Sequence, residues 1–295
     1  MKALLPLCLS ALCSSTCLAE VKKISVGPNP ESVTKGFDGK YFVTLMGTTR
    51  NPGDGDGSIV QLDGDQVKPF VTGLNDPKGI VFIADSLVTA DFTQVWTINS
   101  KGEKTLLAGP DAFPNPILFL NDVVAAPDGK SVLVTDMGAR DKLAGPDGVF
   151  WPIDCAEAKA IPAVGRVYRI TLDGKVTEVV AADEKMKCPN GIDMLPDGTI
   201  RVAEFFTGNI YECSKDGFKE LATGHRSADA IVHDSKGNFY VTEVRTGNVW
   251  RYAPGGEKTK MGEGLTAAAD AFVDEKAGML VVPETKAGQL VFLPL

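Results

Sequence analysis

Histidine is scarce in this sequence, and long uninterrupted apolar runs are missing from it. Only two of the 295 residues are histidine, His225 and His233, and there is no G-x-S-x-G motif, so a Ser-His-Asp hydrolase has little material. The net charge of −8 offers nothing to offset phosphates, which argues against nucleic acid as a partner. No stretch is long and apolar enough to predict a membrane span.

The first 19 residues have the layout of a secretory signal peptide. Lys2 is followed by a short leucine-rich run and then by small residues. Cleavage after residue 19 places the mature chain, residues 20–295, in the periplasm or outside the cell. A lipoprotein signal with Cys17 as the anchor is the alternative, although the three preceding residues are Ser, Ser and Thr rather than the residues that such signals use.

Glycine and proline are plentiful, and they separate many short apolar runs. The 31 glycines and 18 prolines favour short strands over long helices. The runs recur in one register, in which a polar residue, the marker residue, precedes a strand and lies eight positions before a turn residue. Each copy continues with a second and a third strand-like run and usually a fourth, which predicts one propeller blade per repeat of about forty residues. The six marker residues are Glu31, Lys78, Asn121, Asn190, Asp229 and Asp270.

Six repeats predict an all-β, six-bladed β-propeller that occupies residues 20–295 as a single domain. The last repeat ends after its third strand, whereas residues 20–26 have strand character and no repeat of their own. We expect this N-terminal strand to complete the last blade and close the ring, because closure removes exposed sheet edges. An unusually long step of 69 residues between Asn121 and Asn190 marks an insertion in blade three.

The first two strands of a blade are antiparallel, so the marker residues are expected to meet at one mouth of the central tunnel. Oxygen donors from Glu31, Asn190 and Asp229, without His or Cys, suit Ca²⁺, with Mg²⁺ and Mn²⁺ as alternatives. A competing interpretation is that these side chains only form Asx turns at strand starts. Acidic residues at the ends of the second strands are expected in the same neighbourhood, and Glu204 among them competes with Asp229 as a general base.

Four segments carry a resemblance to a known family: NPESV, LNDVVAAPDG, CPNGIDMLPDG and SADAIVHDSKGNFYVTE. They resemble segments of the gluconolactonase and senescence marker protein family, whose six-bladed propellers hold a divalent cation, commonly calcium, on the axis. The resemblance implies that Glu31, Asn190 and Asp229 bind the metal and that Asn121 helps to bind substrate or metal. It also implies that Asp229 donates and accepts the proton in catalysis.

Two positions on the substrate side depart from the family pattern. Phe119 stands where an Arg is common, and Arg140 falls near the place of a Glu. The expectation is a metal-dependent lactonase in which Asp229 accepts a proton from water, Asn121 and Arg140 contact a small-molecule substrate, and Lys78 neutralises a carboxylate or an oxyanion. The alternative is a non-catalytic propeller that binds a ligand or a partner protein at the same mouth.

The insertion, residues 139–164, joins the second and third strands of blade three, which places it at the mouth of the marker residues. Long connections of this kind are usually functional or disordered. The aromatic and proline residues Phe150, Trp151 and Pro152 argue for an ordered lid, and we expect Trp151 to line the substrate pocket.

Three cysteines remain in the mature chain, and an oxidising compartment allows one disulfide among them. Cys155 lies in the insertion, and Cys188 stands two residues before Asn190 at the same mouth. We therefore predict a disulfide between Cys155 and Cys188 that tethers the lid to the site. Cys213 aligns with apolar residues of the other blades and is expected to be a buried thiol.

Overall fold

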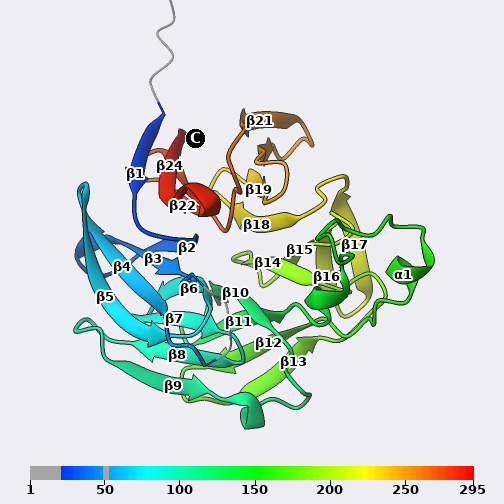
Figure 1. The fold of residues 1–295 in the computed structure, drawn as a ribbon, viewed down its shortest axis with the longest axis horizontal. Helices are drawn as coiled ribbons and strands as arrows, with labels where there is room; N and C mark the ends of the chain where they lie inside the picture. The colour runs from blue at the N-terminus through cyan, green and yellow to red at the C-terminus, as the bar shows by residue number, and fades with distance from the viewer. Residues whose placement is uncertain (1–20, 49–52) are drawn as a thin grey trace, which may run out of the picture.

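The computed structural model describes residues 21–48 and 53–295. The predicted signal peptide, residues 1–19, and the alternative lipid anchor Cys17 lie outside the described residues. Six small sheets surround a central axis (Figure 1), and β-strand dominates the regular structure of the described residues. The predicted all-β, six-bladed propeller is therefore confirmed. No helix in this part of the chain has the length and apolar character needed to cross a membrane.

Each blade is a four-stranded antiparallel sheet whose strands follow one another from the axis outward. Blade one consists of β2 (Pro30–Lys35), β3 (Tyr41–Leu45), β4 (Gly57–Asp63) and β5 (Gln66–Leu74). Blade two consists of β6 (Pro77–Ile83), β7 (Ser86–Asp91), β8 (Gln94–Ile98) and β9 (Lys104–Ala108). Blade three consists of β10 (Leu120–Ala125), β11 (Ser131–Asp136), β12 (Arg166–Thr171) and β13 (Val176–Val180). Blades four and five consist of β14 (Pro189–Met194), β15 (Ile200–Glu204), β16 (Ile210–Ser214) and β17 (Gly217–Ala222); and β18 (Ala228–His233), β19 (Phe239–Glu243), β20 (Val249–Tyr252) and β21 (Lys258–Gly262).

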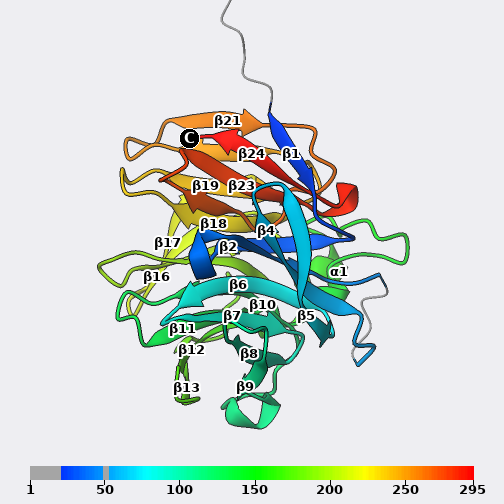
Figure 2. The same ribbon diagram turned by 90° about the vertical axis from the view of Figure 1, so that its left-hand side faces the viewer.

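Blade six joins the two ends of the chain. It contains β22 (Phe272–Asp274), β23 (Met279–Glu284) and β24 (Gln289–Pro294), and its outermost strand is β1 (Lys22–Ser25). The β1 strand pairs antiparallel with β24 from Lys22 opposite Phe292 to Ser25 opposite Gln289, and the two strands lie side by side in Figure 2. Ile24 packs into a core cluster with Leu290. The predicted closure of the ring by the N-terminal strand is confirmed.

The apolar side chains between neighbouring blades form the core. One cluster joins Val88 of blade two to Val134 and Tyr168 of blade three, and all three residues are fully buried. Because both faces of each blade are covered by its neighbours, the second strands are buried along nearly their whole length, as in β3, β7 and β11. This packing fixes the inner strands against one another and thereby fixes the residues at their ends.

A β-bulge at the start of the inner strand recurs in blades one to five. In blade one, Pro30 pairs with Leu45 and Val33 pairs with Val43, so two residues of β2 oppose one residue of β3. The same shift occurs in the inner strands of blades two to five. A bulge re-aims the side chain that it displaces. In each of these blades the marker residue is the first of the two bulged residues.

Two kinds of contact join the bulges of neighbouring blades. Thr44 accepts a hydrogen bond from the N–H of Ser32 (3.0 Å) and donates one to the carbonyl of Lys78 in the next blade (2.8 Å). Other junctions need glycine, because a Cβ on Gly79 would lie 2.4 Å from the backbone nitrogen of Val123 in blade three. The marker residues are thus linked to the next blade through their backbones.

Blade six corrects one expectation, since Asp270 is not the structural equivalent of the other marker residues. Ala268 bridges to Glu284, and the carbonyl of Ala269 accepts the hydrogen bond from Thr242 of the preceding blade. Ala269 therefore occupies the equivalent place. The first arm of this hairpin is one residue longer than in blade five: Ala268, opposite Glu284, lies ten positions before Gly278, whereas Ala228, opposite Glu243, lies nine positions before Gly237. A count of eight back from the turn glycine therefore falls one residue short of the equivalent place. Asp270 instead accepts a hydrogen bond from the Ser32 hydroxyl.

Candidate metal and substrate site

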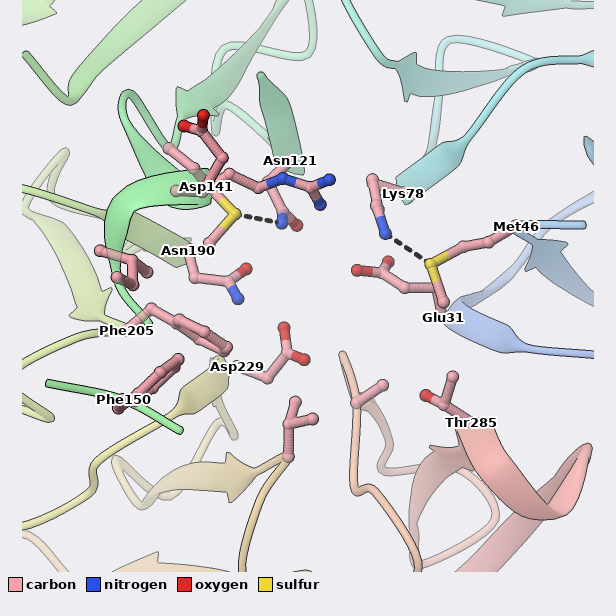
Figure 3. A pocket seen from close by; sticks show the side chains of 15 residues that line it. Glu31, Met46, Lys78, Asn121, Asp141, Phe150, Asn190, Phe205, Asp229 and Thr285 are labelled. Carbon is pink, nitrogen blue, oxygen red and sulfur yellow. Dashed lines mark hydrogen bonds between the residues drawn. The ribbon is translucent and has the colours of Figure 1, made fainter. Parts of the chain in front are cut away.

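A cavity of about 340 Å³ lies where the inner strands begin, and it is lined by residues from all six blades. The blade-one to blade-five marker residues Glu31, Lys78, Asn121, Asn190 and Asp229 line it, and Ala269 represents blade six. Figure 3 shows the side chains of Glu31, Asn121, Asn190 and Asp229 directed into one common space. The structure thus brings together the residues that the repeat register predicted to meet.

Four buried oxygen atoms in this cavity have no hydrogen-bond partner. They are Glu31 Oε2, Asn121 Oδ1, Asn190 Oδ1 and Asp229 Oδ1, and none of the four residues is more than 5% exposed. A buried polar atom without a partner costs about 1–3 kcal/mol, and a cation bound among these four oxygens would satisfy all of them. An all-oxygen donor set fits Ca²⁺, Mg²⁺ or Mn²⁺ and does not fit zinc.

Two carboxylates and two carboxamides make up this donor set. Within residues 21–48 and 53–295, no three His, Cys, Asp or Glu side chains gather as a metal-binding group, so the amides are essential to the donor count. The Nδ2 of Asn121 donates to the Met137 sulfur at 2.7 Å (Figure 3). This contact occupies the amide nitrogen of Asn121. The Oδ1 atoms of Asn121 and Asn190 have no hydrogen-bond partner and are available to a cation.

The two carboxylates carry strongly perturbed pKa values. Burial raises the pKa of Asp229 to about 7, against the opposing charge of Lys78 and with a further rise from Asp122. Burial also raises the pKa of Glu31 well above its usual range, again against Lys78, and Asp229 adds to the rise. Burial without enough positive charge is the cause in both cases, and a divalent cation supplies that charge.

Lys78 is the positive group nearest these carboxylates. It is 5% exposed, its Nζ lies 3.3 Å from Asp76 Oδ1, and its Nζ contacts the Met46 sulfur at 2.5 Å (Figure 3). Both oxygens of Asp76 are buried without a hydrogen bond, so the ion pair with Lys78 compensates that carboxylate without ideal hydrogen-bond geometry. The Lys78 ammonium is therefore held at the cavity wall by charge and by packing.

Arg140 also lines the cavity, from the 3₁₀ turn η3 (Arg140–Lys142) of the insertion. Its guanidinium carbon lies 3.7 Å from the centre of the Phe119 ring, and the Lys78 ammonium lies 5.5 Å from the same centre. Phe119 is 3% exposed and does not line this cavity. Phe119 and Arg140, the two positions that depart from the family pattern, are thus in contact. The Arg140 guanidinium, which comes from the insertion, stacks on the Phe119 ring.

The insertion covers one side of the cavity, and Phe150 lines it directly. The Arg245 guanidinium stacks on the Phe150 ring at 3.6 Å, and it donates to the carbonyl of Gly148 at 2.8 Å. Trp151 lies outside the cavity lining, with its indole against Gly145 and its carbonyl bonded to Arg226. The insertion of blade three is therefore bound to blade five, and Phe150 is the aromatic residue of the insertion that lines the cavity.

The predicted disulfide between Cys155 and Cys188 is not formed. Both residues are free cysteines, as is Cys213. The Cys155 sulfur accepts the N–H of Ala158 and caps the single-turn helix α1 (Ala156–Lys159). Cys188 is fully buried and packs in the apolar cluster under the insertion. Apolar packing, rather than the predicted disulfide, therefore holds the insertion at this point.

The carboxylates at the ends of the second strands have a structural role. Glu204 is fully buried, and its two oxygens accept hydrogen bonds from the N–H of Cys188 (2.8 Å) and of Thr207 (2.5 Å). Asp136 accepts the N–H of Phe119 at 2.9 Å in the same manner. Neither residue lines the cavity, so Glu204 is not placed to act as a base there.

Neither histidine lines the cavity. His225 is fully buried, with its ring nitrogens bonded to Glu243 (2.7 Å) and to the hydroxyl of Tyr252 (2.5 Å). His233 pairs with Asp193 at 2.8 Å. Both histidines are therefore engaged in hydrogen bonds away from the cavity.

Another set of lining residues was missed by the sequence reasoning. These residues share one repeat position, immediately after the last residue of the second strand, and they are Met46, Met137, Phe205, Val244 and Thr285. The same repeat register that identified the marker residues would have found them. They form the mainly apolar rim around the polar marker residues.

The described residues form a β-propeller whose tunnel mouth carries four buried oxygen atoms without hydrogen-bond partners. The family model described as SMP-30/Gluconolactonase/LRE-like region matches residues 74–280. That span exceeds half of the chain, and the chain belongs to this family. A sequence comparison with curated proteins gave no match.

Solved structures share the fold at low sequence identity. A gluconolactonase from Xanthomonas campestris has a TM-score of 0.63 and 16% identity, covering 93% of this chain and 97% of its own. A structural genomics target described as a gluconolactonase has a TM-score of 0.67 and 14% identity, covering 94% of this chain and 92% of its own. Virginiamycin B lyase from Staphylococcus aureus has a TM-score of 0.62 and 15% identity, covering 94% of this chain and 99% of its own.

Proposed function

We propose that this protein is a metal-dependent hydrolase of the lactonase type, acting on a sugar lactone or a related small lactone. The observation that carries the proposal is the convergence of four buried, unpartnered oxygens on one cavity of a gluconolactonase-family propeller. Such a cavity is built to hold a cation beside a small molecule.

Glu31, Asn190 and Asp229, together with Asn121, would hold the cation, and Ca²⁺ suits this oxygen set best, with Mg²⁺ and Mn²⁺ as alternatives. When bound, a divalent cation supplies Lewis-acid polarisation of a lactone carbonyl. The same positive charge relieves the repulsion between the Glu31 and Asp229 carboxylates, whose pKa values are raised by burial.

The remaining chemistry belongs to the side chains of the chain itself. Asp229 accepts the proton of the attacking water and later returns it to the leaving oxygen. Lys78 and Arg140 stand on the cavity wall as cations that neutralise negative charge on the substrate or on the oxyanion. Asn121 orients the substrate, and Phe150 excludes water on the side of the insertion.

A lyase function is less well supported than hydrolysis. The virginiamycin B lyase of Staphylococcus aureus is described as catalytically inactive when one histidine is replaced by alanine. The cavity of this chain has no histidine among its lining residues, and both histidines are engaged elsewhere. The side chains available at the cavity favour carboxylate-based proton transfer.

We also propose that the mature protein works in the periplasm or is secreted, on the basis of the signal-peptide pattern in residues 1–19. A small-molecule substrate is consistent with the size of the cavity, which lies in the range of roughly 300–1,000 Å³ usual for ligand pockets.

The test begins with metal analysis of the purified protein, followed by hydrolysis of glucono-1,5-lactone and γ-butyrolactone before and after chelation. We expect chelation to abolish hydrolysis and calcium to restore it. A metal-loaded protein that hydrolyses no lactone above the uncatalysed rate would instead support the non-catalytic binding propeller. Glu31→Gln should weaken calcium binding by an order of magnitude or more in calorimetry, since it removes a ligand charge. Its matched control, Glu284→Gln, changes a buried glutamate outside the cavity lining and should leave calcium binding unchanged.

A further inference from the structure

A second cavity of about 510 Å³ lies beside the first, on the same end of the propeller. Its apolar lining comes from three places: Phe92 after β7, Leu118 and Phe119 before β10, and Ala139, Pro162 and Val164 from the two ends of the insertion region. This cavity contains none of the oxygen ligands of the first cavity. Arg140, Asp141 and Lys142 complete the lining, and the apolar part of the walls is suited to hydrocarbon rather than to sugar hydroxyls.

The two cavities adjoin along one wall. Arg140 and Asp141 line both of them. The Phe119 ring, on which the Arg140 guanidinium stacks at 3.7 Å, forms part of the second cavity. A ligand whose polar head lies among the marker residues therefore has an apolar compartment next to it, past the aliphatic stem of Arg140.

The walls of the second cavity are held by specific contacts. Phe92 begins the two-residue turn between β7 and β8 with φ of 60°, a left-handed conformation that is rare for a bulky residue. Its ring packs edge-on against Phe119 with centroids 5.6 Å apart, and its carbonyl accepts the N–H of Leu120 at 2.7 Å. Asp136 accepts the N–H of Leu118 at 3.2 Å. The compartment is thus a built part of the fold.

Leu118 marks the rim of this compartment. The residue is 47% exposed and also lines the cavity, so its side chain lies where the cavity opens to solvent.

We propose that the second cavity binds an apolar arm of the substrate, so that the preferred substrates are lactones carrying an alkyl or aryl substituent rather than bare sugar lactones. The lactone ring lies among the marker residues, and the arm passes Arg140 into the compartment formed by Phe92, Leu118 and Phe119. This inference rests on the proposed lactonase function, and it deepens that function by naming the substrate class.

The test uses γ-lactones that carry hydrogen, ethyl, butyl or hexyl at the ring carbon next to oxygen. We expect kcat/KM to rise about fourfold for each methylene that enters the cavity, and so roughly 250-fold over the four methylenes that separate the ethyl from the hexyl compound. Glucono-1,5-lactone should be a poorer substrate than the hexyl lactone. A kcat/KM that is independent of arm length, or that falls as the arm grows, overturns the proposal.

Leu118→Glu tests the location of the arm. The substitution places a charge at the rim of the compartment on an exposed residue, so the fold should tolerate it. It should reduce the ratio of kcat/KM for the hexyl lactone over γ-butyrolactone by about tenfold. The matched control is Leu106→Glu on β9, a leucine that is also 47% exposed and lines neither cavity. An equal change in both variants overturns the assignment.

Calorimetry separates a failure of this inference from a failure of the lactonase function. The probes are 4-hydroxydecanoate and 4-hydroxybutanoate, the ring-opened forms of the hexyl and unsubstituted lactones, with calcium present. Tighter binding of the longer acid, lost in Leu118→Glu, supports the apolar compartment even if no lactone is hydrolysed. Lactone hydrolysis combined with equal binding of the two acids retains the proposed function and refutes the apolar arm.

Discussion

Replacing Asp229 by Asn separates the catalytic role proposed for this residue from its proposed role as a metal ligand. Asn keeps the size of the side chain and one oxygen donor, but it removes the negative charge and the site that accepts a proton. Asn already occupies the corresponding places in blades three and four, at Asn121 and Asn190, so the inner strand should accept it. We expect the fold to be retained, calcium affinity to fall, and kcat to drop by roughly two orders of magnitude or more.

The electrostatic environment sets the expected change in stability of the metal-free protein. The pKa of Asp229 is raised from 3.8 to about 7, chiefly by burial. The folded chain therefore binds this proton more tightly than the unfolded chain, and ionisation costs about 4 kcal/mol of unfolding free energy. The cost is absent below pH 3.8, grows as the pH rises, and is complete above about pH 7. Metal-free Asp229→Asn should therefore be more stable than wild type at pH 8 and equally stable at pH 3.5 or below.

Calorimetric melting at both pH values, with chelator and with excess calcium, measures these differences, and a pH-stat lactone assay gives turnover. At about 2 °C per kcal/mol, the metal-free variant should melt roughly 5–10 °C above wild type at pH 8. Calcium should raise the melting temperature of wild type more than that of the variant. Glu204→Gln is the control, because the protein itself satisfies that carboxylate and its melting shift should not depend on calcium. Full recovery of turnover by Asp229→Asn in excess calcium would refute the role of base and leave only a ligand.

Three further predictions concern the scaffold. Deleting residues 21–26 removes the outer strand of blade six and should lower the melting temperature sharply, whereas an unchanged melt would contradict the closure by β1. Gly191→Ala should lower the free energy of unfolding, measured by urea titration, by about 3 kcal/mol or more, because the new Cβ would lie 2.0 Å from the Asp229 carbonyl oxygen. Gly255→Ala is the control, since no atom lies within 4 Å of its Cβ position. Burial acts to raise the pKa of Glu243, but hydrogen bonds, the strongest from His225, lower it to about 2. Glu243→Gln should therefore destabilise the fold above pH 4.5 and lose this effect toward pH 2. Identical acid unfolding curves for variant and wild type would contradict this.

The fold was predictable from the sequence because every blade repeats the same physical problem. In blades one to five an inner strand turns back into a second strand that is buried between the neighbouring blades, so an eight-residue register recurs from the polar marker residue to the turn. That register was enough to predict the number of blades, the ring closure and the meeting of Glu31, Asn121, Asn190 and Asp229 at one cavity. The donor atoms and the absence of partners for them required coordinates.

The sequence reasoning failed where one residue of register or one side-chain direction mattered. Asp270 was misplaced because the first arm of the blade-six hairpin, counted back from the turn glycine, is one residue longer than that of blade five. The disulfide was predicted because both Cys155 and Cys188 belong near the mouth, but proximity does not fix the direction of a Cβ. The insertion lacks the repeat pattern that fixes the blades, so its sequence did not show which of its aromatic side chains would face the cavity. Trp151 was predicted to line the cavity, and Phe150 lines it instead.

The backbone contacts between the bulges have a consequence for how this protein can evolve. Thr44, Thr135 and Thr242 hold the next blade through the carbonyls of Lys78, Asn190 and Ala269, and Asp270 donates its N–H to the carbonyl of Glu31. None of these contacts uses the side chain of a residue that lines the cavity. A point substitution at such a residue can therefore replace a ligand, a base or a cation without weakening the attachment between blades. New chemistry is accessible here through single mutations, each of which leaves a folded intermediate for selection to act on.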